Sequence, residues 1–413
     1  MKIFIVGLNY SPELTGIGKY TGELAPWLAR RGHLVKVITS PPYYPEWRIH
    51  PGFKNRWTQE STDGVTVYRC PLFVPSEVTT MKRILHLLSF SLSLVIRFIS
   101  LWREKPDVVL LVVPTLFCAP VVWLYSRWVG ARSIIHIQDF EVDAMFGLGI
   151  VSTKKTEKSF TIKRFIMHIE SWILRRFDRV STISFKMLDH AVQKGVERDR
   201  LFIFPNWTDT LFVHPAVDRS KFRNIWDIAK SDKIVLYSGN IGVKQGLELV
   251  LDVATRYRFR TDVHFFMVGA GAYWGILKKL AHEKKLSNVH FKPLVPWKEL
   301  PALLAMADVH LVIQRKGVAD AVLPSKLTNI LSIGGNAIVT AEKNTELSIL
   351  ADRYPGIYTC IIPEDSDTLY EALEIELAKT RQNEVARQYA LKNLEKEKVL
   401  GEFELNLKQL IER

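Results

Sequence analysis

The sequence predicts an α/β protein made of two Rossmann-like, doubly wound domains that face an interdomain cleft. Three observations support this fold class. Apolar runs alternate with longer helical patterns along the whole 413-residue chain. The runs are nearly continuous Val, Ile and Leu, which is typical of parallel strands buried on both faces of a sheet. A polar, partly helical stretch over residues 209–232 divides the runs into two series.

Each series supplies the strands of one sheet. The first is expected at residues 3–7, 34–39, 65–69, 108–113, 133–138, 179–183 and 201–204, and the second at 233–238, 263–268, 289–291, 309–313, 337–340 and 359–362. We place the boundary near residue 215, which gives an N-terminal domain over residues 1–215 and a C-terminal domain over residues 216–413. The last helix is a candidate to pack back on the N-terminal domain. Because ligands of doubly wound sheets bind at the carboxyl ends of the strands, the cleft is the expected active site.

Positive charge is concentrated in the N-terminal half. The net charge is +13, and residues 1–219 carry 29 Lys and Arg against 19 Asp and Glu. Such a field favours anionic partners, namely nucleic acid, phosphorylated sugars or an anionic membrane surface. The three cysteines are too scattered for a disulfide framework or a zinc site, and the chain opens on a strand pattern rather than a signal peptide. We therefore expect a cytoplasmic protein.

Two segments of this half combine apolar bulk with cations. Residues 84–102 are the most hydrophobic stretch, yet they contain His86 and Arg97 and are flanked by further cations. Residues 154–179 hold eight Lys and Arg against three acids, with aromatic residues between them. This composition favours helices that lie in the headgroup region of the membrane over a helix that spans it. The alternative is a pair of buried helices that cross the sheet.

Gly16 and Gly18 follow the first strand in the motif TGIGKY. A dinucleotide fingerprint would need a third glycine three residues later and an acidic residue about 20 positions on. Here Gly22 comes one residue late, and the strand at 34–39 ends in Ser-Pro-Pro. NAD(P) binding is therefore disfavoured. The two glycines either serve a tight turn or let a phosphorylated substrate approach the backbone.

A stronger phosphate signal follows the strand at 233–238. Gly239, Asn240, Lys244 and Gln245 lie in a glycine-rich turn that opens a helix, where backbone N–H groups converge and Lys244 supplies a point charge. The turn lacks the Walker pattern, which argues against an ATPase. Alternatively, these glycines only form the turn between the strand and the helix and bind no ligand.

A second donor-binding candidate is ADAVLPSKLTNILSIGG, residues 319–335. Ser325 is expected to cap a helix that Gly334-Gly335 ends. Lys326 and Asn329 lie three apart, on one helical face, where they could meet a phosphate and a ribose. A solvated lysine and a capping asparagine would explain the same residues.

Polar groups also follow the strand at 133–138. Gln138, Asp139, Glu141 and Asp143 emerge at its carboxyl end, and His136 points to the same side as Gln138. We take Gln138, Asp139 and His136 as catalytic candidates, although a histidine in an apolar strand is more often a core residue. Asp365 and Asp367 form a literal D-x-D, which we interpret as a helix cap rather than as a metal site.

Three motifs occur in order along the chain: SPELTGIGKYTGEL, YSGNIGVKQGLE and LPSKLTNILSIGGNA. Together they resemble glycosyltransferase family 4, which has the GT-B fold. PPYYPEW, VPTLFC and HIQDFEVDAM are also similar to the enterobacterial colanic acid fucosyltransferases of that family.

The resemblance implies a retaining, metal-independent transfer in exopolysaccharide biosynthesis. The donor would be a nucleotide sugar, GDP-fucose, with no other cofactor. The acceptor would be an undecaprenyl-diphosphate-linked saccharide, reached by a peripheral enzyme at the inner face of the inner membrane. The resemblance also implies that Gly16 and Gly18 approach the donor, and that the turn at residues 239–246 binds its phosphates.

The motifs depart from the family at several positions. Asn240 stands where much of the family has Arg, and Gln245 follows Lys244 at the second basic position. The family's paired glutamates fall on Asn329 and near Asp320, and its N-domain histidine falls on Gln138. The identity of the catalytic residue therefore stays open. An epimerase of the same fold and a basic nucleic-acid-binding protein are the rival functions.

Overall fold

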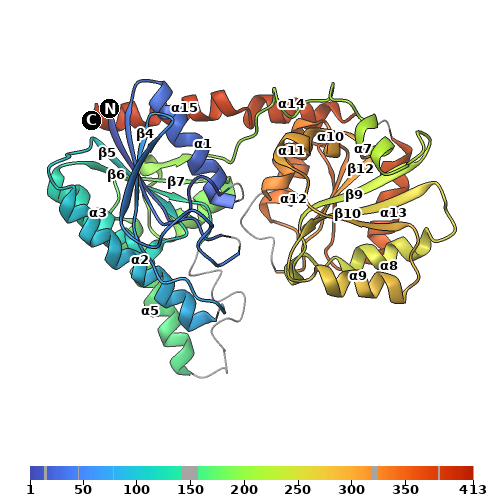
Figure 1. The fold of residues 1–413 in the computed structure, drawn as a ribbon, viewed down its shortest axis with the longest axis horizontal. Helices are drawn as coiled ribbons and strands as arrows, with labels where there is room; N and C mark the ends of the chain where they lie inside the picture. Colours follow the sequence, from blue (N-terminus) through green and yellow to red (C-terminus); the bar gives the residue numbers. More distant parts are fainter. Residues whose placement is uncertain are drawn as a thin grey trace. The chain divides into compact units, whose positions relative to one another are not determined.

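The computed structural model describes residues 1–13, 16–44, 46–77, 79–140, 157–317, 324–379 and 382–412. The chain forms two compact units, each with its own sheet (Figure 1). Unit 1 comprises Met1–Pro205 and Leu400–Arg413, and unit 2 comprises Asn206–Val399.

Unit 1 is built on an eight-stranded sheet of order β3-β4-β2-β1-β5-β6-β7-β8. All neighbours are parallel except β3 and β4. The strands are β1 (Lys2–Val6), β2 (Leu34–Thr39), β3 (Thr58–Thr62), β4 (Val65–Arg69), β5 (Val108–Val113), β6 (Arg132–Ile137), β7 (Arg179–Thr182) and β8 (Leu201–Ile203). The chain runs outward from β1 in one direction and from β5 in the other, so the strand order reverses between these two strands.

The helices of unit 1 connect its parallel strands. They are α1 (Gly16–Arg30), α2 (Thr80–Ser100), α3 (Ala119–Val129), α5 (Glu157–Leu174) and α6 (Phe185–Gln193). The central strands β1 and β5 are buried along nearly their whole length, and every residue of β5 is buried. This burial is the reason that the strand sequences are continuously apolar.

Strand β3 is the one strand of the described residues that the sequence analysis missed. Its sequence, TQEST, is polar and mostly exposed, because β3 lies at the edge of the sheet. It pairs antiparallel with β4 through a tight turn at Asp63 and Gly64, which have φ angles of 54° and 77°. An Asp-Gly pair before an apolar strand is a hairpin signal, and it was available in the sequence.

Unit 2 contains a six-stranded, fully parallel sheet of order β11-β10-β9-β12-β13-β14. The strands are β9 (Lys233–Asn240), β10 (Val263–Ala270), β11 (Val289–Lys292), β12 (Val309–Val312), β13 (Ala337–Thr340) and β14 (Thr359–Ile361). The predicted second series of strands is confirmed. The strand order reverses between β9 and β12, where an open α/β sheet leaves a crevice at its carboxyl end.

Helices cover both faces of the unit 2 sheet. They are α7 (Ser220–Ile225), α8 (Glu248–Arg256), α9 (Trp274–Glu283), α10 (Leu300–Ala305), α11 (Ser325–Ser332), α12 (Glu346–Arg353), α13 (Ser366–Ala378) and α14 (Glu384–Asn393). Ile234 and Leu236 of β9 join the core beneath α7, α10, α11, α12 and α14, while Val235 and Tyr237 join the core beneath α8, α9 and α13. The alternation follows from the two-residue period of a strand.

The units divide at Pro205 and Asn206, earlier than the predicted boundary near residue 215. The reason is that residues 206–213 are tied to unit 2. Thr208 Oγ1 donates to Asn329 Oδ1 at 2.7 Å, and Ser332 Oγ donates to the carbonyl of Val213 at 2.6 Å.

The C-terminal helix α15 (Lys396–Ile411) contributes its residues from Leu400 onward to unit 1. The ring of Phe403 stacks on Phe204, with centroids 4.1 Å apart. Glu404 is buried, and its carboxylate meets His33 Nε2 at 3.0 Å, Arg31 Nε at 3.2 Å and Lys408 Nζ at 2.8 Å. A buried carboxylate with three cationic or polar donors therefore anchors the end of the chain.

Glu404 also makes the stability of unit 1 dependent on pH. Burial by itself raises the pKa of Glu404, but hydrogen bonds from Lys408 and His33 and the charge of Arg31 outweigh it and bring the pKa to about 2. An acid with a lowered pKa stabilises the fold above its unfolded pKa of 4.5, and this contribution disappears as the pH falls toward 2.

We expect Glu404→Gln to reduce the free energy of unfolding of unit 1 by roughly 1.5–3 kcal/mol at neutral pH, the range for hydrogen bonds to charged groups. The difference from wild type should shrink below about pH 4.5, where the carboxylate of the unfolded wild-type chain becomes protonated, and disappear as the pH approaches the folded-state pKa of about 2. Urea unfolding at several pH values measures both effects. Glu402→Gln, on the exposed side of α15, is the matched control. Equal losses in the two variants would contradict the anchoring role of Glu404.

Candidate functional site

The candidate site of unit 2 lies where its strand order reverses. Strand β9 ends in Gly239 and Asn240, and the neighbouring strand β12 is followed by Gln314 and Arg315. Helix α11 begins soon after β12 and brings Lys326 to the same edge of the sheet. The residues that the sequence singled out in two separate motifs therefore meet at one place.

Glycines allow the backbones of β9 and β10 to approach each other closely at this edge of the sheet. Gly239 has a φ of 145°, a conformation that other residues rarely adopt. A Cβ on Gly269 of β10 would lie 1.9 Å from the carbonyl oxygen of Gly239. No side chain fits at Gly269 without moving the backbone of β9. The requirement for glycine here comes from contacts within the protein.

The turn after β9 is held by side chains that the sequence analysis did not single out. Arg315 Nε donates to the carbonyl of Val243 at 2.8 Å, and its second nitrogen donates to Glu248 Oε1 at 2.8 Å. Tyr273 Oη donates to the same carboxylate oxygen at 2.6 Å. The only sequence signal for Arg315 is its position, since it is a cation directly after a buried strand.

Lys244 and Gln245 play different parts in this turn. Gln245 Oε1 accepts a hydrogen bond from the backbone N–H of Gly242 at 3.0 Å, so this side chain closes the turn. Lys244 is exposed, and its backbone carbonyl accepts from the N–H of Arg315 at 3.0 Å. Its side chain is therefore the solvent-exposed cation of the turn, while that of Gln245 closes the turn.

Lys326 is the most constrained cation of the site. Its Nζ lies 3.9 Å from the centroid of the Tyr237 ring, and Tyr237 Oη donates to the carbonyl of Asn240 at 2.6 Å. The side chain of Lys326 also passes Gly239, where a Cβ would lie 3.7 Å from its Cδ. Removal of the ammonium group from water lowers the pKa of Lys326 to about 7. The lysine is thus held beside the turn, in an environment that disfavours its charged form relative to a solvated lysine.

The other two candidates of α11 occupy different environments. Asn329 is buried, and its Oδ1 accepts from Thr208, so the amide oxygen is already engaged within unit 2. Ser325 is exposed and is the first residue of α11, whose N-cap is Pro324, so the predicted Ser325 cap is wrong. The proline ring fixes φ of Pro324 at −58°, and its ψ of 128° keeps this residue outside the helix. The predicted end of the helix is confirmed, because Gly334 has a φ of 67° and the N–H of Gly335 donates to the carbonyl of Ile330.

In unit 1, the two glycines at the start of α1 are required for different reasons, Gly16 for its backbone conformation and Gly18 for its small size. Gly16 has a φ of 56° and open space around its Cα. Gly18 has no such freedom, because a Cβ would lie 2.8 Å from the Cβ of Glu13. The glycine therefore leaves room for a buried glutamate, which the sequence analysis did not identify.

Glu13 connects the loops that follow β1 and β2. Its Oε1 accepts from the backbone N–H groups of Tyr43 and Tyr44 at 2.8 and 2.9 Å, and its Oε2 accepts from Asn9 Nδ2 at 2.8 Å. Burial raises the pKa of Glu13, and the hydrogen bonds from Tyr44, Tyr43 and Asn9 oppose this effect. The carboxylate therefore holds the first part of the loop after β2, at Tyr43 and Tyr44, against the start of α1.

Arg69 reaches the same loops from the end of β4. One guanidinium nitrogen donates to the carbonyl of Ser40 at 3.1 Å and the other to the carbonyl of Ser11 at 2.9 Å. Its Nε donates to Glu60 Oε1 of β3 at 2.8 Å, and the side chain is buried. The loops at the carboxyl ends of β1, β2 and β4 thus form one hydrogen-bonded cluster.

The catalytic candidates in β6 and directly after it lie in different environments. His136 is buried, with Nδ1 2.9 Å from Ser181 Oγ and its ring 4.9 Å from that of Phe204, and burial lowers its pKa to about 3. This is the environment of a core residue. Gln138 is also buried, whereas Asp139 is exposed. Glu141, Asp143 and Asp320 lie outside the described residues.

The D-x-D sequence caps a helix, as predicted. Asp365 Oδ1 accepts from the N–H groups of Asp367 and Thr368, both at 3.0 Å, at the start of α13. Asp367 is paired with Arg256 on α8. Within the part of the chain that the structure describes, no group of three His, Cys, Asp or Glu side chains is arranged to hold a metal ion.

Comparison with known proteins shows which family shares this sequence and this fold. Residues 15–207 match the glycosyl transferase 4-like domain, and residues 218–393 match the glycosyl transferases group 1 family. Over 406 residues, 98% of each chain, the sequence is 48% identical to WcaI of Escherichia coli (strain K12). That protein is named as a colanic acid biosynthesis glycosyl transferase, an assignment that its name marks as provisional.

The chain belongs to glycosyltransferase family 4. Its fold is GT-B. Sucrose-phosphate synthase of Thermosynechococcus elongatus superposes with a TM-score of 0.73 at 15% identity, covering 99% of this chain and 98% of that one. The HepE protein of Anabaena, solved with UDP, gives a TM-score of 0.67 at 13% identity over 99% of this chain and 100% of that one. These structural relatives establish the fold alone.

The contact between Gly269 and Gly239 in this family 4 glycosyltransferase gives a direct prediction. Gly269→Ala should lower the free energy of unfolding of unit 2 by about 3 kcal/mol, the upper part of the range for overpacking, because the backbone of β9 must move. Thermal or urea unfolding measures this loss. Gly275→Ala is the matched control, because nothing lies within 4 Å of its Cβ position in α9. The control should be neutral or slightly stabilising. A neutral Gly269→Ala would refute the close approach.

Proposed function

We propose that this glycosyltransferase moves fucose from GDP-fucose to an undecaprenyl-diphosphate-linked saccharide, in colanic acid biosynthesis, at the cytoplasmic face of the inner membrane. The observation that carries the proposal is the position of Lys326 beside Gly239 and Asn240 at the carboxyl end of β9. The 48% identity to the colanic acid protein of Escherichia coli supports the pathway, and the Anabaena relative solved with UDP supports a nucleotide donor.

In this proposal, unit 2 holds the donor diphosphate. When the bond between the anomeric carbon and the diphosphate oxygen breaks, negative charge develops on the leaving diphosphate. Lys326 and Lys244 supply cations there, from the start of α11 and from the turn after β9. Because Tyr237 and Gly239 fix Lys326 before the donor binds, little reorganisation of this cation is needed during the reaction.

The exposed apolar surface of unit 1 supports docking on a membrane. On α2, the exposed large apolar side chains recur at helical spacing along one stripe: Met81, Leu85, Leu88, Leu92, Ile96 and Ile99. Trp102, just beyond this helix, stacks on Trp128 of α3 with centroids 6.3 Å apart, and Trp123 of α3 contacts Trp172 of α5. These contacts connect α2 to α3 and α3 to α5, and we call the α2 stripe together with the exposed Trp102, Trp128 and Trp172 the membrane-docking surface.

The opposite face of α2 argues for a helix that lies on the membrane. Met81–Ser100 is the one helix of the described residues that is long and apolar enough to cross a bilayer, but 39% of it is buried inside the protein. Phe90, Leu94 and Phe98 pack into unit 1, and the ring of Phe98 stacks on Tyr125 at 4.0 Å. Exposed cations such as Arg83 and Arg103 accompany the apolar stripe, as expected for an interfacial helix.

Donor binding should depend on pH through Lys326. The ammonium form predominates below its pKa of about 7 and is lost as the pH rises, so we expect the affinity for GDP-fucose to fall by up to about tenfold per pH unit above that value. The dependence should end at the higher pKa that the diphosphate imposes in the complex. Isothermal titration calorimetry between pH 6 and 8.5, roughly the range in which this group titrates, measures the effect.

Two variants distinguish the effect of the positive charge of Lys326 from the effect of its loss of a proton at higher pH. Lys326→Met should weaken GDP-fucose binding by roughly one to two orders of magnitude and remove the pH dependence, because it removes a charge-assisted contact. Lys326→Arg should retain more affinity without the pH dependence, since arginine stays protonated. Unchanged affinity in Lys326→Met would remove Lys326 from the donor site and refute the proposal.

The membrane-docking surface predicts a separate result. Leu92→Glu should sharply reduce co-flotation of the purified protein with vesicles that contain anionic lipid, because Leu92 is 69% exposed at the middle of the α2 stripe. Leu211→Glu, the same substitution at an 83% exposed position of unit 2, should float like wild type. Equal flotation of both variants would count against docking through α2.

A further inference from the structure

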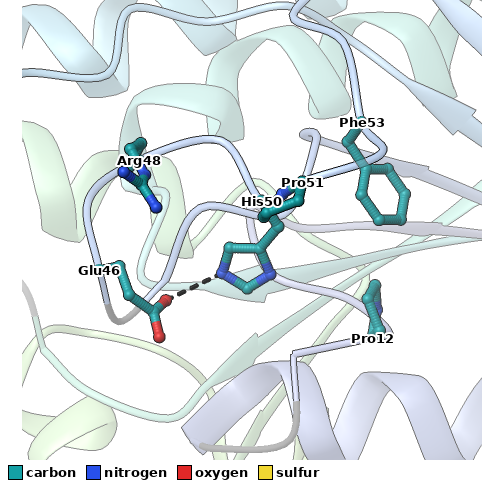
Figure 2. Close-up of a pocket in the computed structure, with 6 residues that line it drawn as sticks. All are labelled: Pro12, Glu46, Arg48, His50, Pro51 and Phe53. Atoms are coloured by element: carbon teal, nitrogen blue, oxygen red, sulfur yellow. Dashed lines mark hydrogen bonds and ion pairs between the residues drawn. The ribbon is translucent and has the colours of Figure 1, made fainter.

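Unit 1 has a pocket of about 420 Å³ that no part of the proposed donor site uses (Figure 2). It lies among the loops at the carboxyl ends of β1 and β2, the edge of the sheet where open α/β proteins bind ligands. Its volume falls in the range of small-molecule sites, about 300–1,000 Å³. The lining residues are Pro12, Glu46, Arg48, His50, Pro51 and Phe53.

The loop that lines the pocket is held in place before any ligand binds. The N–H of His50 donates to the carbonyl of Pro42 at 3.0 Å, and the N–H of Arg48 donates to the carbonyl of Tyr43 at 3.2 Å. Glu13 fixes the beginning of the loop through the N–H groups of Tyr43 and Tyr44. These contacts position the backbone from which Arg48 and His50 reach the pocket.

The charges of the pocket are balanced. Glu46 and Arg48 are opposite in sign, and His50 Nε2 lies 2.9 Å from Glu46 Oε2, the contact that is dashed in Figure 2. A site for a phosphate would present an excess of cations and backbone N–H groups, whereas this pocket places a carboxylate beside its cation. Charge therefore favours a neutral ligand over an anionic one.

The polar groups of the pocket match hydroxyl groups in particular. A carboxylate accepts hydrogen bonds, a guanidinium donates them, and an imidazole does both in its neutral form. A hydroxyl group both donates and accepts, so a ligand with several hydroxyl groups can satisfy all three side chains.

The remaining walls of the pocket are flat and apolar. Figure 2 shows Phe53 and Pro12 on the side of His50 away from Glu46. The guanidinium of Arg69 lies 4.7 Å from the centroid of Phe53 and fixes this ring from outside the set of lining residues. A pyranose ring has an apolar C–H face and a rim of hydroxyl groups, which suits an aromatic wall opposite a polar one.

We propose that this pocket binds a neutral sugar, the saccharide end of the acceptor, between Phe53 and the polar group of Glu46, Arg48 and His50. The inference rests on the proposed function, because it assigns the pocket to the second substrate of that reaction. Arg48 and Glu46 are binding residues in this assignment. The lipid diphosphate of the acceptor would lie outside the pocket.

Saturation-transfer difference NMR with a panel of methyl hexopyranosides tests this site on the full-length protein. At least one glycoside should receive saturation from wild type, and Arg48→Ala and Glu46→Gln should weaken its binding by roughly tenfold, since each removes a hydrogen bond to a charged group. Arg56→Ala is the matched control, because Arg56 is exposed in the same segment and does not line the pocket. It should behave as wild type.

Two results would overturn the assignment. One is the absence of saturation transfer to every glycoside in wild type, or equal transfer in all four proteins. The other is displacement of the glycoside by inorganic diphosphate, which would make the pocket an anion site. A thermal shift with GDP-fucose is measured on the same samples. If that shift is present while sugar binding fails, the pocket assignment is wrong and the donor proposal stands; if the shift is absent in wild type, the proposed function fails independently.

Discussion

The close approach of two backbone segments in unit 2 is the constraint on which the candidate site depends. The carbonyl oxygen of Gly239 occupies the space that a side chain on Gly269 would need. This contact sets the end of β9 against β10, and the ring of Tyr237 on β9 then supports Lys326 from α11. The position of the cation is therefore a consequence of parallel strand pairing. A site built on a sheet edge in this way is rigid before it meets a substrate.

Both units place a constrained ionisable side chain behind a glycine-bearing turn. In unit 1 the carboxylate of Glu13 packs against Gly18 and collects the N–H groups of the loop after β2. In unit 2 the side chain of Lys326 packs against Gly239. The glycines thus leave space for protein side chains as well as for any ligand. The Gly16-x-Gly18 spacing resembles a phosphate-binding pattern, yet the small size of Gly18 is already explained by Glu13.

Much of the fold follows from the sequence because parallel strands buried on both faces must be continuously apolar. The strands β2, β4, β5 and β13 have the predicted bounds. The polar edge strand β3 was missed for the same physical reason, since an exposed strand carries no such pattern. The family assignment came from three motifs, and the comparisons confirm it.

The candidate site was less predictable than the fold. The sequence identified Gly239 and Lys326 but not the residues that support this site, Tyr237 and Arg315. Such supporting residues are far from their partners in the sequence, as Arg315 is from Val243, so no local motif reveals the contact. Conversely, His136 stands out in the sequence but is enclosed in the core of unit 1. A residue type at the end of a strand gives no information on whether its side chain reaches solvent.

The central claim is that the turn after β9, together with Lys326, holds the donor diphosphate. Amide hydrogen exchange of the full-length protein, with and without GDP-fucose, tests this claim most directly. The account predicts slower exchange in the nucleotide complex over residues 239–246 and at the start of α11. Slower exchange confined to unit 1, or none in these two segments of unit 2 at saturating GDP-fucose, would contradict it.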